Sequence, residues 1–218
     1  MAIASWQDLC LDAVDDQALG RFYAQVLGLE YQQRGTDVYL TGPTEGHRIW
    51  INRVPEPHTV KNRVHLDVHC ASVAELEALG ARTLEVFPRW TVMADPEGNE
   101  LCAFVRDEPP PYRLYELVID TVDSPALAAW WAEVLGARSG RDGEDDWVDQ
   151  VPGMPFDGLC FDNVAEGKTV KNRVHWDVKA DPQALVAAGA TIVRERGADI
   201  GWTVMADPEG NEFCAFTD

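Results

Sequence analysis

WTVMADPEGNE, residues 90–100, is repeated letter for letter at residues 202–212, and each copy runs on through one apolar residue into Cys-Ala-Phe. A second phrase, TVKNRVH, occurs at residues 59–65 and again at residues 169–175. The two phrases keep their order, and their second copies follow the first by 110 and 112 positions. A period of this size is too long for a solenoid repeat and suits one compact domain present twice. The sequence therefore predicts a duplicated domain.

Hydrophobic periodicity predicts the same order of elements in both halves. Residues 63–70, RVHLDVHC, alternate strictly, which puts valine and leucine on one face of a strand and histidine and aspartate on the other. A helical apolar stripe follows Asp15 or Asp16 as N-cap and stops at Gly28. Residues 95–98, Asp-Pro-Glu-Gly, have the composition of a turn and lead into a last strand. Each half therefore reads as strand, helix and three strands, given twice.

Three consecutive prolines divide the chain. We expect one domain at residues 1–106, a proline-rich linker at residues 107–111 and a second domain at residues 112–218. The two copies are expected to pack together as two subunits do, either in a monomer with pseudo-dimeric halves or in a homodimer.

Composition and charge narrow the classes of partner. The formal net charge is −19 at pH 7, so we expect neither nucleic acid nor a membrane as a partner, because both select surplus lysine and arginine. The N-terminal segment lacks the basic and apolar regions of a secretion signal, and no apolar run approaches the length of a membrane span. The five cysteines contain no CxxC pair, which fits reduced thiols. These features predict a cytoplasmic protein.

The element order and motifs resemble the vicinal oxygen chelate superfamily, whose members include glyoxalase I, bleomycin-resistance proteins, extradiol dioxygenases and fosfomycin-resistance proteins. The resemblance rests on residues 54–56, 61–67 and 206–214 and is closest to the glyoxalase-like branch. It implies an α+β fold of two glyoxalase-like domains, each a pair of βαβββ modules forming cupped mixed sheets. The scaffold hosts lyases, isomerases, dioxygenases and proteins that only bind, so the fold by itself implies no single chemistry.

The resemblance also implies positions for a metal. Members that bind one hold a divalent ion in the cup with side chains from the first, fourth, fifth and last strands. Matched by motif, these positions in the second half are Glu116, Asp162, His175 and Cys214. The weaker set of the first half is Asp8, Asn52, His65 and Cys102. The donors suit Zn, Ni, Mn or Fe, and a thiolate favours Zn, although both cysteines stand where the family normally has glutamate. In the alternative interpretation, histidine and aspartate pair with each other and no metal binds.

Further residues are candidates for catalysis or ligand binding. Glu100 and Glu212 share a face with the last-strand cysteines and are candidates for an acid or base. Four tryptophans lie on strands or loops where a flat ligand would stack: Trp50, Trp90, Trp176 and Trp202. Arg173 is a candidate to bind a substrate carboxylate. In the alternative interpretation, this arginine and Arg63 pair with Asp67 and Asp177 or with Glu97 and Glu209 and fasten the modules together.

Two functional classes follow. The first is a protein that binds a small, planar or cationic metabolite or antibiotic and sequesters it, as bleomycin-resistance proteins do. The acidic charge, the many tryptophans and the missing last-strand glutamate favour this class. The alternative is a divalent-metal-dependent lyase or isomerase of the glyoxalase type, acting on a small carbonyl or oxygenated substrate.

Overall fold

The computed structural model describes residues 2–143 and 145–217, which form four modules in chain order. The first contains β1 (Ala4–Ala13), α1 (Asp16–Leu27), β2 (Glu30–Arg34), β3 (Asp37–Thr41), the short 3-10 helix η1 (Glu45–His47) and β4 (Ile49–Arg53). The second contains β5 (Val64–Cys70), α2 (Val73–Leu79), β6 (Arg82–Val86), β7 (Thr91–Ala94) and β8 (Glu100–Val105). The third contains β9 (Leu114–Thr121), α3 (Ser124–Leu135), β10 (Arg138–Asp142), β11 (Asp145–Asp149) and β12 (Gly158–Asn163). The fourth contains β13 (Val174–Ala180), α4 (Pro182–Ala187), β14 (Thr191–Arg194), β15 (Thr203–Ala206) and β16 (Glu212–Phe216).

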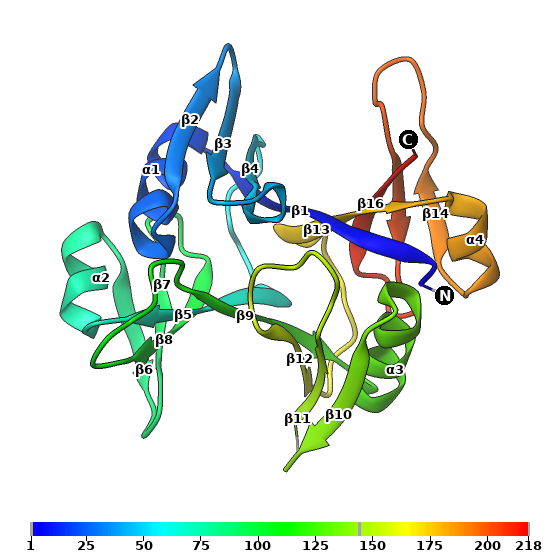
Figure 1. Ribbon diagram of the computed structural model, residues 1–218. Helices are drawn as coiled ribbons and strands as arrows, with labels where there is room; N and C mark the ends of the chain where they lie inside the picture. Colours follow the sequence, from blue (N-terminus) through cyan, green and yellow to red (C-terminus); the bar gives the residue numbers. More distant parts are fainter. Residues whose placement is uncertain (1, 144, 218) are drawn as a thin grey trace.

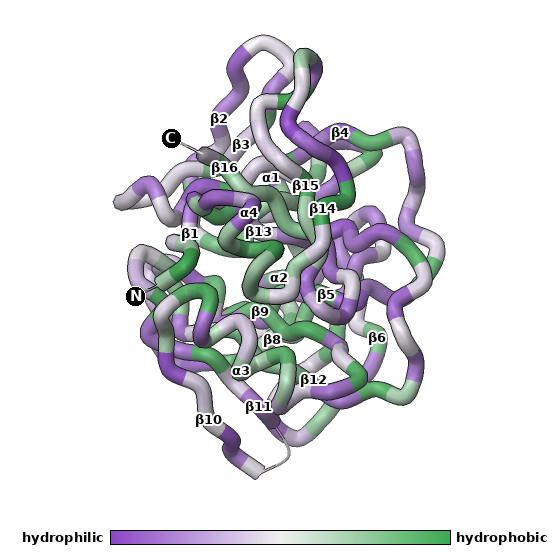
Figure 2. Tube along the Cα trace, turned by 90° about the vertical axis from the view of Figure 1, so that its right-hand side faces the viewer, coloured by the Kyte–Doolittle hydropathy of each residue, from purple (hydrophilic) through white to green (hydrophobic). Residues whose placement is uncertain are grey.

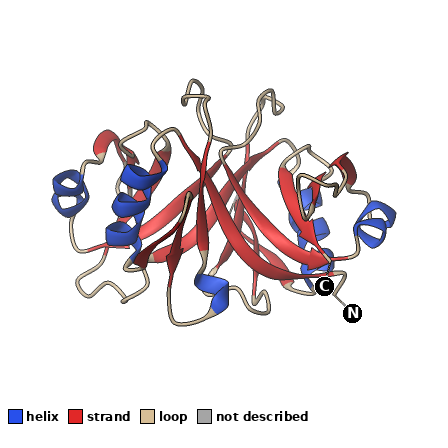
Figure 3. Ribbon diagram, turned by 90° about the horizontal axis from the view of Figure 1, so that it is seen from above, coloured by secondary structure: helices blue, strands red, loops and turns tan. Residues whose placement is uncertain are grey.

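Two eight-stranded mixed sheets result, and each takes one module from each half of the chain. The first sheet has the order β14-β15-β16-β13-β1-β4-β3-β2, and the second has the order β10-β11-β12-β9-β5-β8-β7-β6. Their centres are the antiparallel pairs β1–β13 and β5–β9, which join the two halves. In Figure 1 the first sheet lies above the second. Figure 3 shows the strands between helices at the two outer ends. The predicted α+β fold is confirmed.

Helix α1 begins and ends where the sequence predicts. Asp15 accepts a hydrogen bond from the first turn of α1, and Gly28 ends that helix with φ at 70°. The positive φ favours glycine, because a Cβ would strain the backbone in this region. Ser72 caps α2 in the same way, and Gly80 ends it with φ at 114°.

Strand alternation separates the core from the functional faces. Val64, Leu66 and Val68 of β5 are buried in the hydrophobic core, while His65 and Asp67 point to the other face of the sheet. Figure 2 shows hydrophobic stretches such as β9 running through the middle and hydrophilic segments towards the outer loops. No helix within residues 2–143 and 145–217 is long and apolar enough to cross a membrane.

The repeated Asp-Pro-Glu-Gly turns fasten one sheet to the other. Glu97, between β7 and β8, accepts hydrogen bonds from the backbone N–H groups of Val14 and Asp15 at the start of α1, at 2.9 and 2.7 Å. The Arg173 guanidinium, beside the first strand of the fourth module, donates to the same carboxylate at 3.1 Å. Glu209 accepts from the backbone at the start of α3 in the same manner. These carboxylates therefore stabilise the N-termini of helices that belong to modules of the other sheet.

Candidate functional site

Each sheet forms one cup, and both halves of the chain line each cup. The first cup encloses about 840 Å³ and is lined mainly by β1, β4, β13, β15 and β16. The second cup encloses about 1220 Å³ and is lined mainly by β5, β8, β9, β11 and β12. The sequence left open whether a site would lie within one copy or between copies. The structure places both cups between copies.

This arrangement divides the residues that the sequence analysis grouped as one metal centre. Glu116 and Asp162 line the second cup, whereas His175 and Cys214 line the first. The division follows from strand pairing, because β13 joins β1 and leaves β9 to β5. The weaker set is divided as well: Asp8 and Asn52 line the first cup, and His65 and Cys102 line the second.

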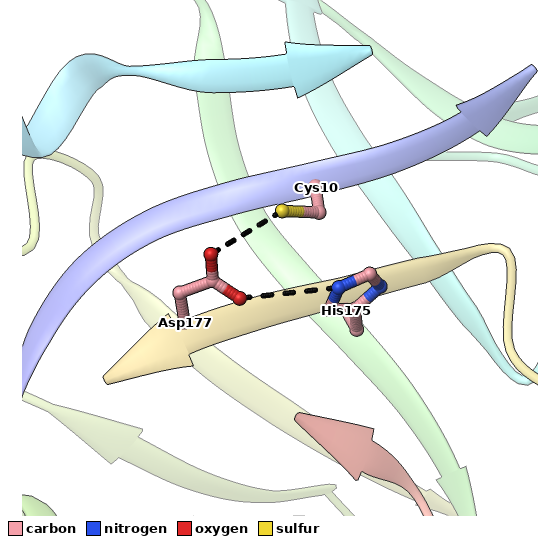
Figure 4. A group of neighbouring side chains, drawn as sticks. All are labelled: Cys10, His175 and Asp177. Atoms are coloured by element: carbon pink, nitrogen blue, oxygen red, sulfur yellow. Dashed lines mark hydrogen bonds and ion pairs between the residues drawn. The ribbon is translucent and has the colours of Figure 1, made fainter. Parts of the chain in front are cut away.

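In the first cup, Cys10, His175 and Asp177 lie together on the paired strands β1 and β13 (Figure 4). The Cys10 thiol donates to Oδ2 of Asp177 at 3.5 Å, and Nε2 of His175 lies 3.9 Å from Oδ1 of Asp177. One donor atom from each residue lies within 4.8 Å of the other two, and all three residues are buried. Burial lowers the pKa of His175 to about 4, so its imidazole is neutral at neutral pH. Burial and the charge of Asp8 raise the pKa of Asp177 to about 7.

In the first cup, the implied ligand Asp8 already has other contacts. Oδ2 of Asp8 accepts a hydrogen bond from the Trp50 indole at 3.3 Å, and Oδ1 lies 3.6 Å from the Arg48 guanidinium. Of the implied ligands, only His175 belongs to the cluster of Figure 4. Cys10 was not among the predicted ligands, although alternation along β1 puts it on the same face as Asp8.

The second cup contains a similar cluster of three buried donors. Nε2 of His65 lies 3.5 Å from Sγ of Cys102 and 3.4 Å from Oδ1 of Asp67. Within the described ranges, Oδ1 of Asp67 and Nδ1 of His65 have no hydrogen-bond partner although they are buried. Imidazole, carboxylate and thiol donors at this spacing fit a divalent ion such as zinc.

Negative charge dominates the second cup. Seven carboxylates line it: Asp67, Glu116, Asp142, Asp145, Asp149, Asp157 and Asp162. Only two arginines, Arg89 and Arg106, line the same cavity. Burial, together with neighbouring carboxylates of which Asp67 has the largest effect, raises the pKa of Glu116 to about 8. This half-buried carboxyl therefore lacks the positive neighbour that would favour its ionised form.

Four aromatic rings also line the second cup, beside the carboxylates. The rings are those of Trp90, Phe104, Tyr115 and Trp147. Trp90 stacks near-parallel on Phe104, with ring centroids 6.2 Å apart, and Phe104 meets the edge of Tyr115 at 5.4 Å. The second cup therefore combines flat aromatic surfaces with acidic side chains, of which Asp149 is paired with Arg138.

The two glutamates proposed as acid or base are held by the chain itself. Glu212 lines the first cup, but its oxygens accept hydrogen bonds from Lys168 Nζ at 2.6 Å and from the Asn172 backbone at 3.1 Å. Glu100 lines neither cup; it accepts from the Asn62 backbone at 3.0 Å. Both carboxylates therefore anchor the segments that lead into β13 and β5.

The structure places the predicted ligand-binding residues in different parts of the molecule. Trp50 and Trp202 line the first cup, and Trp90 lines the second. Trp176 instead packs in the core, 4.8 Å from Trp131 between ring centroids, because it follows His175 on β13 and so points to the opposite face. Arg173 contacts Glu97 and lines neither cup, which matches the interpretation in which it fastens modules.

Comparison with solved structures shows a shared fold. A mutant of glyoxalase I from Zea mays matches 99% of this chain and 94% of its own, with 13% identity and a TM-score of 0.73. A candidate dioxygenase from Bacillus subtilis matches 100% of this chain and 86% of its own, with 16% identity and a TM-score of 0.63. The cppA protein from Streptococcus pneumoniae matches 99% of this chain and 100% of its own, with 12% identity and a TM-score of 0.51.

Sequence comparison gives the family. No curated protein matches the chain. The family model described as the glyoxalase-like domain matches residues 8–104 and again residues 116–216. These two segments contain the strands that build both cups. The chain therefore belongs to the glyoxalase-like domain family, within the vicinal oxygen chelate superfamily, as two copies of the domain in tandem.

Proposed function

We propose that this protein binds a flat, cationic small molecule in the second cup and sequesters it without chemical change. The observation that carries the proposal is the lining of that cup, where seven carboxylates face two arginines beside four aromatic rings. A cation over an aromatic face gains about 0.5–2 kcal/mol, and surrounding carboxylates concentrate cations further. The volume of about 1220 Å³ is ample for a molecule of drug size.

Sequestration is favoured over turnover by the state of the predicted catalysts. Hydrogen bonds from the chain already engage Glu100 and Glu212. A general base must reach the proton that it removes, and a carboxylate used as an anchor is not free to do so. A resistance or storage protein needs affinity alone, which the second cup supplies with stacking surfaces and charge.

The test uses two probes of nearly the same shape, N-methylacridinium, a permanent cation, and neutral acridine. Isothermal titration at about pH 9, above the pKa of Glu116 of about 8, is expected to show one site for the cation and binding of acridine weaker by at least about tenfold. Glu116→Gln should weaken binding of the cation by about tenfold. The matched control is Asp8→Asn, which changes the equivalent first-strand position in the other cup and should leave affinity unchanged.

The outcomes separate a site from general attraction to an acidic chain. Equal binding of cation and neutral probe would contradict the proposal. So would equal losses in Glu116→Gln and Asp8→Asn, since non-specific attraction depends on total charge, which both variants change by one unit.

A second function, a divalent-metal-dependent lyase or isomerase acting on a small carbonyl or oxygenated substrate, is favoured by the clusters of histidine, aspartate and cysteine in both cups. Its test is turnover of the hemithioacetal of methylglyoxal and glutathione after loading with Zn, Ni, Mn or Fe(II). Metal-dependent turnover that disappears in His65→Ala would support this function, and no turnover with any of the four metals would contradict it for this substrate class.

A further inference from the structure

We propose that the flat cation bound in the second cup also carries an anionic group, such as a carboxylate, which Arg89 and Arg106 bind at the rim. The inference rests on the proposed function and deepens it, because it names the ligand class of the same cavity as flat zwitterions.

The charges that line the second cup are separated along the sheet. Six of its seven carboxylates come from the third module, on β9 to β12 or between these strands, and the seventh, Asp67, lies on β5. Both arginines come from the second module: Arg89 lies between β6 and β7, and Arg106 directly follows β8. The strand order β10-β11-β12-β9-β5-β8-β7-β6 therefore puts the acidic residues in one half of the cup and the guanidinium groups in the other, with Asp67 between them.

The chain itself does not neutralise these guanidinium groups. Among the residues that the structure describes, no carboxylate forms an ion pair with Arg89 or Arg106. Arg138, in the acidic half, is in contrast paired with Asp149. Arg106 donates from Nη1 to the neighbouring Val105 carbonyl at 3.3 Å. A guanidinium has five N–H donors, so most of its hydrogen-bonding capacity remains for a ligand.

Aromatic rings restrict the positions of both guanidinium groups. Cζ of Arg89 lies 5.8 Å from the centre of the Trp90 ring, and Cζ of Arg106 lies 5.8 Å from the centre of the Phe104 ring. Arg106 is two residues beyond Phe104, so strand alternation puts both side chains on the cup face. An exposed guanidinium over an aromatic ring gains about 0.5–1 kcal/mol, and its planar shape suits a carboxylate with two parallel hydrogen bonds.

Arg89 also lies in a tight turn. The Phe87 N–H donates to the Trp90 carbonyl at 2.9 Å, and the two rings stack with centroids 5.0 Å apart. Pro88 fixes its own φ between them. The backbone that carries Arg89 is therefore ordered before a ligand arrives, although the side chain is exposed.

The first cup shows that the aromatic stack does not need an arginine at this turn. Trp202 and Phe216 stack there with ring centroids 5.5 Å apart and an interplanar angle of 28°, as their counterparts do in the second cup. Gly201 stands at the position equivalent to Arg89. The guanidinium at this position therefore distinguishes the second cup, and its substitution should leave the stack intact.

The separation of the charges gives the shape of the ligand. Neighbouring strands lie about 4.8 Å apart, so β12 and β8, three intervals apart in the sheet, are separated by about 14 Å along it. The curvature of the cup shortens the direct path, so we expect the cationic and anionic groups about 10 Å apart on an aromatic framework.

The experiment compares two probes that differ in a single group. One is N-methylacridinium bearing a para-carboxyphenyl group opposite the ring nitrogen, a zwitterion, and the other is its para-carbamoylphenyl counterpart, a simple cation. Both are titrated by calorimetry into the full-length protein at about pH 9, where Glu116 is ionised. The zwitterion should bind at least about tenfold more tightly than the amide, because its carboxylate gains charge-assisted hydrogen bonds. Without an arginine subsite, the net charge of −19 would repel the carboxylate and reverse that order.

The variants assign the preference to the arginines. Arg89→Gln and Arg106→Gln should each reduce the ratio of the two affinities by about threefold or more, and the double variant should reverse it. The matched control is Arg82→Gln, which removes the same charge from an exposed position on β6 outside the cup and should leave the ratio unchanged. Circular dichroism verifies the fold of each variant.

The inference is overturned if the amide binds the unmodified protein as tightly as the zwitterion does, or if the double variant keeps the ratio of Arg82→Gln. Binding of the amide and of N-methylacridinium in that case still supports the proposed function, so the two failures are distinguishable. Binding of the zwitterion alone would support the arginine subsite and contradict the proposed function for simple cations. Absence of binding by all three probes overturns both.

Discussion

The charge of the second cup depends on pH because Glu116 ionises near neutral pH. Its pKa of about 8 lies above the ordinary value of 4.5 because of burial and neighbouring carboxylates. The folded protein therefore binds this proton more tightly than the unfolded chain does. The stability that the proton provides is full below about pH 4.5 and is lost as the pH rises through about 8. A bound cation favours the ionised form, so affinity changes in the opposite direction.

We therefore predict that affinity for N-methylacridinium rises by about tenfold between about pH 7 and about pH 9, while the free energy of unfolding of the unliganded protein falls over the same range. Glu116→Gln should flatten both profiles and make the protein more stable than the parent at about pH 9, by about 1–2 kcal/mol. Titration calorimetry and urea unfolding measure the two quantities. A pH profile of affinity that is unchanged in Glu116→Gln would assign the effect to another group.

Single residues show what strand alternation could and could not predict. The alternation correctly put His65 and Asp67 on one face of β5. In β13, which repeats β5, Trp176 follows the equivalent histidine, so the same alternation puts Trp176 on the core face. Trp176 was proposed for stacking because it is aromatic and lies on a strand, and the alternation should have overruled composition. Cys10 could likewise have been added to the cup from its place beside Asp8.

At the scale of elements, the repeated Asp-Pro-Glu-Gly turn connects one sheet to the other through its side-chain hydrogen bonds. Its aspartates also accept hydrogen bonds from helices: Tyr23 of α1 donates to Asp95 at 3.0 Å, and Trp131 of α3 donates to Asp207 at 3.2 Å. The sequence predicted the turn and its hairpin. It could not predict these contacts, because their partners are 72 and 76 positions away in the chain.

We expect Glu209→Ala to lower the free energy of unfolding by about 1–3 kcal/mol, since it leaves the N–H groups at the start of α3 without their acceptor. The same carboxylate lies 3.7 Å from the Arg63 guanidinium, which would lose its partner. Urea unfolding measures the change, with the exposed Glu85→Ala as the control. Cation binding in the second cup should persist in Glu209→Ala under native conditions, and its loss would show that the turn also shapes the cup.

At the scale of the whole molecule, each sheet combines one module from the first half of the chain with one module from the second half. The repeat predicted four modules but could not predict their pairing, because β5 and β13 begin with the same residues, Val-His, and end their motif alike in Asp-Val. Either strand offers β1 an equivalent partner by local sequence. This ambiguity is why one proposed metal centre was assembled from residues of both cups.

Because β1 pairs with β13 and β5 with β9, neither half should fold as a stable monomer. Residues 1–106 or 112–218 produced alone would each expose two central strand edges and a cut core. We expect each half to be unfolded or self-associated, and co-expression of both to restore a one-to-one complex with the circular dichroism of the intact chain. Size-exclusion chromatography with light scattering measures this, and a folded monomer of either half would contradict it.

The shared cups have a consequence for how this chain can change over time. In a dimer of identical subunits, every substitution enters both sites at once, so a gain in one site is constrained by its effect on the other. Here a substitution in β1 or β13 alters only the first cup, and one in β5 or β9 alters only the second. Because one chain provides both cups from different residues, the two sites are not held equal and can diverge in the ligands that they select.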